Sequence, residues 1–107
     1  LPWYVYKKDI PNNEIYVCQG GDNELLMNKG LYVEDINYIN DIEYKYPIKC
    51  SIQVRHQHTP VNCTIEKLSN EYKVMFEEPI RAIAPGQSAV FYDNEICLGG
   101  GVICKTF

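Results

Sequence analysis

Apolar and polar residues alternate with a period of two along most of this chain. In the segment 50–55, Cys50, Ile52 and Val54 fall on one side of an extended chain, and the residues between them on the other. The segment 61–67 repeats the pattern. Because successive side chains of a strand point to opposite faces, each segment predicts a strand with one core face and one solvent face.

Turn residues separate these segments at short intervals. Residues 10–13, 69–70 and 93–95 are turn-rich and predict hairpin connections. Pro60 and Pro79 are predicted to interrupt strands, because proline cannot donate to a ladder. A further short strand is expected over residues 31–36. Six or seven short strands with regular turns predict an all-β domain, built as a small closed barrel or a sandwich.

The C-terminal segment combines a tight turn with three consecutive glycines. Pro85-Gly86 fits the two central positions of a type II turn, after which Gln87 begins a strand. Residues 89–92 are apolar on both faces, which predicts a strand buried on both sides or packed on a neighbouring domain. A phosphate-binding loop at residues 99–101 is disfavoured, because no Lys-Ser/Thr follows the glycines. These glycines instead predict a bulge or a sharp corner where backbones approach closely.

Composition indicates one globular domain that spans residues 1–107. Hydrophobic residues make up 46% of the chain and charged residues 22%, and no apolar run approaches 18 residues. We therefore expect no membrane partner. The chain starts with Leu1 and not with Met, so it is expected to be a fragment of a larger protein. Five cysteines without close pairing predict reduced thiols and a cytoplasmic location.

Charge is unevenly distributed along the sequence. The net charge is −4, which argues against a general nucleic-acid binder. Residues 44–65, however, contain Lys45, Lys49 and Arg55 and no acid, together with His56 and His58. This segment predicts a local contact with RNA or another polyanion, and a solvated basic strand end is the alternative.

Other chemistry is weakly indicated. A tetrahedral zinc site could be formed by Cys50, His56, His58 and Cys63. His56 and His58 are closely spaced, but the sequence has no second closely spaced pair of ligands, which disfavours the site. Glu77 and Glu78 are consecutive, so on a strand they point apart and make a poor acid/base pair. The N-terminal aromatic residues could stack bases, but they are more typical of core or of a docking surface for other domains: Trp3, Tyr4 and Tyr6.

Three segments carry a family resemblance: "APGQSAVFYDNEICLGGGVI", "VRHQHTPVNCTI" and "WYVYKKD". Together they resemble the C-terminal domain of the tRNA-specific 2-thiouridylase (MnmA/TrmU) family, over essentially the whole chain. The resemblance implies a small antiparallel β-barrel similar to domain 2 of translation elongation factors. It also implies a larger enzyme in which an N-terminal ATP-pyrophosphatase domain and a central domain precede this one.

The function that the resemblance implies is ATP-dependent transfer of sulfur to C2 of the wobble uridine of tRNA. The full enzyme would use ATP and Mg, and a sulfur-carrier protein would supply the sulfur. This domain is expected to hold no cofactor or metal and no catalytic residue, since the family's Ser-Gly-Gly-Val-Asp-Ser nucleotide loop is absent from the sequence. Its expected partners are tRNA, the other two domains and the sulfur carrier.

The resemblance places tRNA contacts at Arg55, His56 and Gln87. Arginine can bind phosphate or base edges, histidine can stack or donate, and a glutamine amide both donates and accepts. Arg55 and His56 are adjacent, so both reach RNA only if the strand ends or bulges there. The alternative function is a structural or protein-interaction barrel that stabilises the parent enzyme or docks a sulfur carrier without touching RNA.

Overall fold

The computed structural model describes residues 1–20, 26–54 and 59–107, except for the side chain of Tyr6. Every regular element in these ranges is a strand, as the alternating pattern predicted. The strands are β1 (Trp3–Asp9), β2 (Glu14–Gln19), β3 (Met27–Val33), β4 (Asn37–Tyr38), β5 (Ile48–Gln53), β6 (Val61–Lys67), β7 (Tyr72–Arg81), β8 (Ser88–Asp93) and β9 (Ile96–Thr106). Within the described ranges, nothing helical combines the length and hydrophobicity that a membrane crossing needs.

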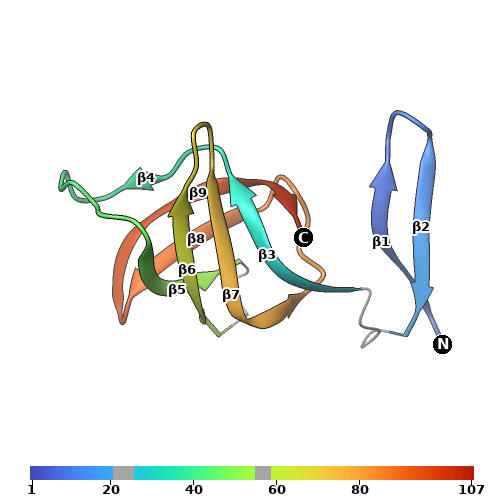
Figure 1. Cartoon of the computed structure of the whole chain (residues 1–107). Helices are drawn as coiled ribbons and strands as arrows, with labels where there is room; N and C mark the ends of the chain where they lie inside the picture. Colours follow the sequence, from blue (N-terminus) through green and yellow to red (C-terminus); the bar gives the residue numbers. More distant parts are fainter. Residues whose placement is uncertain (21–25, 55–58) are drawn as a thin grey trace.

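Six of the strands close into an antiparallel barrel. The order β3-β7-β6-β5-β8-β9 returns to its start because β9 also pairs with β3, with Leu31 opposite Thr106 and Val33 opposite Ile103 (Figure 1). The short strand β4 extends the sheet beside β9. Closure gives β3 and β9, the two edge strands, each other as partners, so the described part of the barrel leaves no long edge open for pairing with another chain. The all-β barrel prediction is confirmed.

The barrel interior is filled by apolar side chains from all six strands. Those least accessible to solvent are Leu31, Val33, Ile52, Ile65, Val74, Ala89, Phe91 and Ile103. In the segments singled out by alternation, Ile52, Val54, Cys63 and Ile65 are buried, whereas Cys50 and Val61 are half-buried. In β8, Ala89 and Phe91 are buried and the two apolar residues between and after them are half-buried. Alternation therefore identified the inward face correctly.

The predicted hairpin turns form where the sequence indicated. Asn13 and Asn94 adopt positive φ angles of 54° and 55° in the turns between β1 and β2 and between β8 and β9. Asparagine tolerates this left-handed region better than most residues. In the first turn, Asp9 also accepts hydrogen bonds from the backbone and side-chain amides of Asn12, at 3.3 and 2.8 Å.

The predicted limits of two strands are wrong. Pro79 does not end a strand, because β7 continues through it to Arg81. The register between β3 and β7 shifts there: Asn28 opposes Ile80, while Gly30 opposes Met75. Pro79 thus lies in a bulge, where the sheet needs no hydrogen bond from a backbone N–H at that position. The strand predicted over residues 31–36 is β3, which begins earlier, at Met27, and ends earlier, at Val33. Beyond its end, Asp35 accepts a hydrogen bond from the backbone amide of Ile36 at 2.9 Å, and the chain turns.

The glycines of β9 lie where two backbones meet. A Cβ on Gly99 would collide with the carbonyl of Asn37, and one on Gly101 with the carbonyl of Asp35. The pairing of β8 and β9 also shifts register between Phe91 and Tyr92, opposite this stretch. The predicted bulge with close backbone approach is confirmed.

The hairpin β1–β2 forms a separate two-stranded sheet beside the barrel (Figure 1). Val5 and Val17 are directly opposed in it, so they share one face with Trp3 and Ile15, and all four are exposed. On the other face Cys18 is buried, and the guanidinium of Arg81 from β7 lies 5.2 Å from the ring centroid of Tyr4. The exposed Trp3 is therefore a surface residue and not part of the core.

Candidate nucleic-acid interface

The Pro85-Gly86 corner forms the predicted type II turn. Gly86 has a φ of 92°, and the Gln87 amide donates to the Ala84 carbonyl at 3.3 Å, which closes the four-residue turn. A second bond ties the corner to the barrel, because the Gly86 amide donates to the Ile103 carbonyl at 2.8 Å. The corner is thus fixed to β9 by its backbone.

Gln87 holds this turn with its side chain. Its Oε1 accepts a hydrogen bond from the Ala84 backbone amide at 2.8 Å, and its own carbonyl accepts from the Ile103 amide at 2.9 Å. Among the described residues the side-chain nitrogen Nε2 has no hydrogen-bond partner. The amide is therefore oriented by its acceptor end and retains donors for a ligand.

The strand that leads to Arg55 ends beside the strand that starts after Gln87. Gln53, the last residue of β5, is the Cα partner of Val90 on β8, and β8 begins at Ser88. The C-terminal end of β5 and the N-terminal end of β8 are therefore neighbours at one end of the barrel. Arg55 and His56 lie outside the described residues, so their predicted RNA contacts remain predictions.

Carboxylates border this region more closely than the sequence suggested. A surface pocket of about 490 Å³ beside the turn is lined by Pro85 and Gly86 and also by Glu34 and Asp35. A second pocket, of about 250 Å³, places Glu77 and Glu78 of β7 next to Thr59 and its neighbours. Residues 59–62, which belong to the acid-free segment 44–65, thus lie beside acids that the pairing of β6 with β7 brings from elsewhere in the chain. Any phosphate contact here must be local, and not the work of a broad basic surface.

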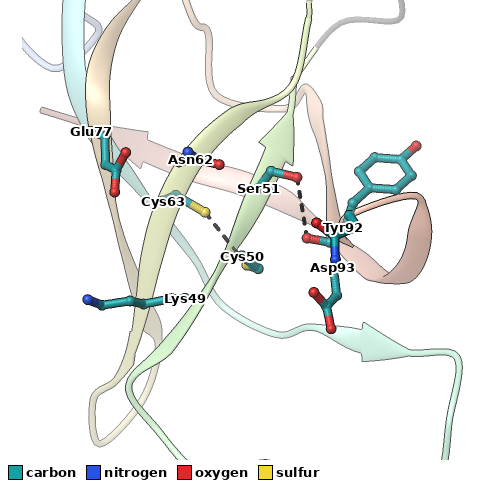
Figure 2. A pocket seen from close by; sticks show the side chains of 9 residues that line it. Lys49, Cys50, Ser51, Asn62, Cys63, Glu77, Tyr92 and Asp93 are labelled. Carbon is teal, nitrogen blue, oxygen red and sulfur yellow. Dashed lines mark hydrogen bonds between the residues drawn. The ribbon is translucent and has the colours of Figure 1, made fainter.

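The structure brings Cys50 and Cys63 together. They are direct Cα partners on β5 and β6, and their sulfur atoms are 3.7 Å apart. Both cysteines line a surface pocket of about 300 Å³ with Lys49, Glu77 and Asp93 (Figure 2). The hydrogen bond with Cys63 lowers the pKa of the Cys50 thiol, whereas that same bond and burial raise the pKa of Cys63. Sequence alternation had placed both residues on the inward face without showing that they pair.

The zinc hypothesis gains no support from the described residues. His56 and His58 lie outside them, and within ranges 1–20, 26–54 and 59–107 no three histidine, cysteine or acidic side chains cluster as metal ligands would.

A tyrosine cluster near β4 was not predicted. The hydroxyls of Tyr38 and Tyr46 are hydrogen-bonded at 2.6 Å, and the rings of Tyr38 and Tyr44 stack with centroids 4.0 Å apart. Tyr46 also packs against Tyr72 of β7, with centroids 5.6 Å apart. The sequence signal was the density of tyrosine between residues 38 and 46. We regard the cluster as structural, because it ties the β4–β5 connection to the barrel wall.

A family profile described as "Aminomethyltransferase beta-barrel domain" matches residues 28–103, which is most of the chain, so the protein belongs to this family of barrel domains. The match covers the barrel and leaves out β1 and β2.

Curated relatives extend the comparison to the hairpin. The chain is 47% identical over 102 residues to a tRNA-specific 2-thiouridylase MnmA of Pseudomonas fluorescens, covering 95% of this chain and 27% of that protein. The 2-thiouridylases of Pseudomonas savastanoi and Citrobacter koseri are 47% and 41% identical, again over 95% of this chain. The resemblance inferred from the motifs is confirmed. The chain spans little more than a quarter of the length of these relatives.

Proposed function

We propose that this barrel is the tRNA-contacting accessory domain of a cytoplasmic tRNA-uridine 2-sulfurtransferase, which makes 2-thiouridine at the wobble position in an ATP-dependent reaction. In this proposal the barrel holds no catalytic residue, and the ATP and Mg chemistry belongs to other parts of the longer enzyme. Arg55, His56 and Gln87 contact the RNA. Similarity to proteins named 2-thiouridylases over nearly the whole chain supports the assignment to this enzyme class.

The Gln87 amide is the observation that carries the RNA-contacting role. Its acceptor oxygen is used within the turn, and its donor nitrogen has no partner among the described residues. The end of β5, from which the chain continues to Arg55, lies beside the start of β8. A donor held in fixed orientation loses little entropy on binding, so it suits the recognition of a phosphate or base oxygen.

The test is tRNA affinity in the full-length enzyme. Arg55→Ala should weaken binding by about 1–2 kcal/mol, the cost of losing a charge-assisted contact. Gln87→Glu is the sharper variant, because the carboxylate can still accept from Ala84 while the outward donor is lost and a negative charge is added. It should weaken binding by at least about 1 kcal/mol without loosening the turn.

Lys67→Ala is the matched control for charge. Lys67 is an exposed cation at the far end of β6, whose first residue, Val61, pairs with Ile52. The control variant should bind tRNA as the unmodified enzyme does. Unchanged affinity and thiolation in correctly folded Arg55→Ala and Gln87→Glu enzymes would end the RNA-contacting proposal.

A second candidate function is supported by the hairpin. Trp3, Val5, Ile15 and Val17 form an exposed apolar face on a two-stranded sheet, and the chain covers 27% of its relative's length. Two-stranded hairpins are marginally stable alone, so such a face is typical of a surface that packs on another part of the protein. In this alternative the domain is a structural or docking module for the parent enzyme or for a sulfur carrier.

Polar substitution of that face separates the two functions. Val5→Ser combined with Val17→Ser should destabilise the full-length enzyme, or weaken its binding of the sulfur carrier, if the docking role holds. An RNA-positioning role confined to the Gln87 corner predicts that tRNA affinity is unchanged in this variant once the enzyme is folded.

A further inference from the structure

Cys50 and Cys63 have the arrangement of a cross-strand dithiol. They are direct partners in an antiparallel pair, and such partners have Cα atoms about 4.5–5.5 Å apart, which lies inside the range that a disulfide accepts. Their sulfurs are already 3.7 Å apart and point toward each other (Figure 2). A bond between them therefore requires side-chain rotation and no rearrangement of the barrel.

The two thiols are not equivalent. Cys50 is half-buried and Cys63 is 3% exposed, and both line the 300 Å³ pocket. The hydrogen bond between the two thiols lowers the pKa of Cys50 and raises the pKa of Cys63, which burial raises further. Cys50 is thus the more accessible sulfur and the one more readily present as thiolate, which is the reactive form.

We propose that Cys50 and Cys63 form a redox-active pair that peroxides oxidise reversibly to a cross-strand disulfide, with Cys50 as the attacking sulfur and Cys63 as the resolving one. The pocket of about 300 Å³ has room for a molecule as small as a peroxide beside Cys50. None of the RNA contacts proposed above is needed for this reaction.

The steps balance with hydrogen peroxide as the oxidant. The Cys50 thiolate attacks one peroxide oxygen, the O–O bond breaks, and the leaving hydroxide takes up a proton, which gives Cys50 sulfenic acid and water. The Cys63 sulfur then attacks the Cys50 sulfur, the S–O bond breaks, and the hydroxyl leaves as a second water with the Cys63 proton. Two thiols lose two electrons in total, and peroxide is reduced to two waters. A dithiol reductant reverses the bond by thiol–disulfide exchange.

Peptide mapping of the full chain tests the proposal. The reduced chain is treated with equimolar hydrogen peroxide, alkylated under denaturing conditions and digested. We expect alkylatable cysteines to fall from five to three, that is five minus the two of the pair, with a Cys50–Cys63 linked peptide that dithiothreitol removes. A map in which both residues stay alkylatable, or in which the links join other cysteines, would overturn the proposal whatever the variants do.

Single substitutions assign the roles. Cys63→Ser should stop at Cys50 sulfenic acid, which a dimedone probe traps. Cys50→Ser should leave Cys63 unmodified, with a peroxide reaction at least about tenfold slower than that of Cys50 in the unmodified chain. Cys97→Ser is the matched control, a half-buried cysteine outside the pair that should leave disulfide formation unchanged. Equal reactivity of Cys50 and Cys63 in the two single variants would contradict the assigned order of attack.

Discussion

The barrel and the β1–β2 hairpin are both antiparallel sheets, but only the barrel encloses a core. Pairing of β9 with β3 gives every strand of the barrel two neighbours, and the residues inside it reach 0–1% exposure, as at Leu31, Ile65 and Phe91. The hairpin has two strands, and its Trp3 and Ile15 are 65% and 63% exposed. The same alternating pattern therefore produces a core in one region and an open apolar face in the other.

The difference shows that the apolar face of a strand stabilises the fold only when another apolar surface covers it. Inside the barrel the inward faces of six strands cover one another. Each Å² of apolar surface that is buried there stabilises the fold by about 25 cal/mol. The exposed face of the hairpin gains no such stabilisation, because its apolar side chains remain accessible to solvent. Barrel and hairpin substitutions should consequently differ in their effect on stability.

Phe91→Ala should give the largest loss. The side chain is fully buried in the barrel, and large-to-small changes at such sites cost about 3–5 kcal/mol of unfolding free energy. Urea unfolding followed by far-ultraviolet circular dichroism measures the change. Val102→Ala, at a 60% exposed position of β9, is the control and should cost less than about 0.5 kcal/mol. Similar losses in the two variants would mean that the barrel interior is not the main source of stability.

Two glycine substitutions should rank next. Gly101→Ala places a methyl group against the Asp35 carbonyl and should cost about 2–3 kcal/mol through overpacking. Gly86→Ala meets nothing within 4 Å, but its φ of 92° should cost about 1 kcal/mol. Urea midpoints of both variants test the ranking, and a reversed order would show that the backbone conformation at Gly86 matters more than the packing at Gly101.

Tyr38→Phe removes the hydroxyl bonded to Tyr46 and should cost about 1 kcal/mol. Burial raises the pKa of Tyr38 above its ordinary value of 10.0. Because its folded-state pKa is raised, neutral Tyr38 contributes fully to the free energy of unfolding below pH 10. Above pH 10 the tyrosine of the unfolded chain ionises first, so this stabilisation is lost as the pH rises. Unfolding measured between pH 8 and 11 should therefore show a shallower alkaline loss in Tyr38→Phe, and identical slopes would contradict the shift.

Trp3→Ser should have the smallest effect on the chain by itself. The side chain lies on the open hairpin face, so its loss should change the unfolding free energy of the barrel by less than about 0.5 kcal/mol. The same denaturation assay checks this value. A loss above 1 kcal/mol would mean that the hairpin face is covered by this chain, and the contrast between the two regions would have to be abandoned.

Local patterns predicted the elements better than their limits. Turn residues such as Asn94 and Pro85-Gly86 were recognised because they determine backbone dihedral angles without help from distant residues. Pro79 was misassigned, because whether its missing N–H matters depends on the register of β3 against β7. Register is a property of two segments and is not visible in one.

The candidate site was predictable in part for the same reason. The turn that contains Gln87 has the expected geometry, whereas the RNA contact of Gln87 stays a prediction. The acids beside the site were missed because they come from other parts of the chain: Glu34 and Asp35 follow β3 and lie at the corner, and Glu77 of β7 lies near Thr59. Cys50 and Cys63 appeared together only in the weak zinc hypothesis, and their direct contact could not be predicted because the two residues are thirteen positions apart along the chain.

The sequence by itself determined the strand period, the inward faces and the turns, because each follows from side-chain alternation and local dihedral preference. Tertiary structure decided closure of the barrel, the pairing of the two thiols and the charge around the Gln87 corner. These depend on which strands become neighbours, and that choice is made by the burial of all six inward faces together.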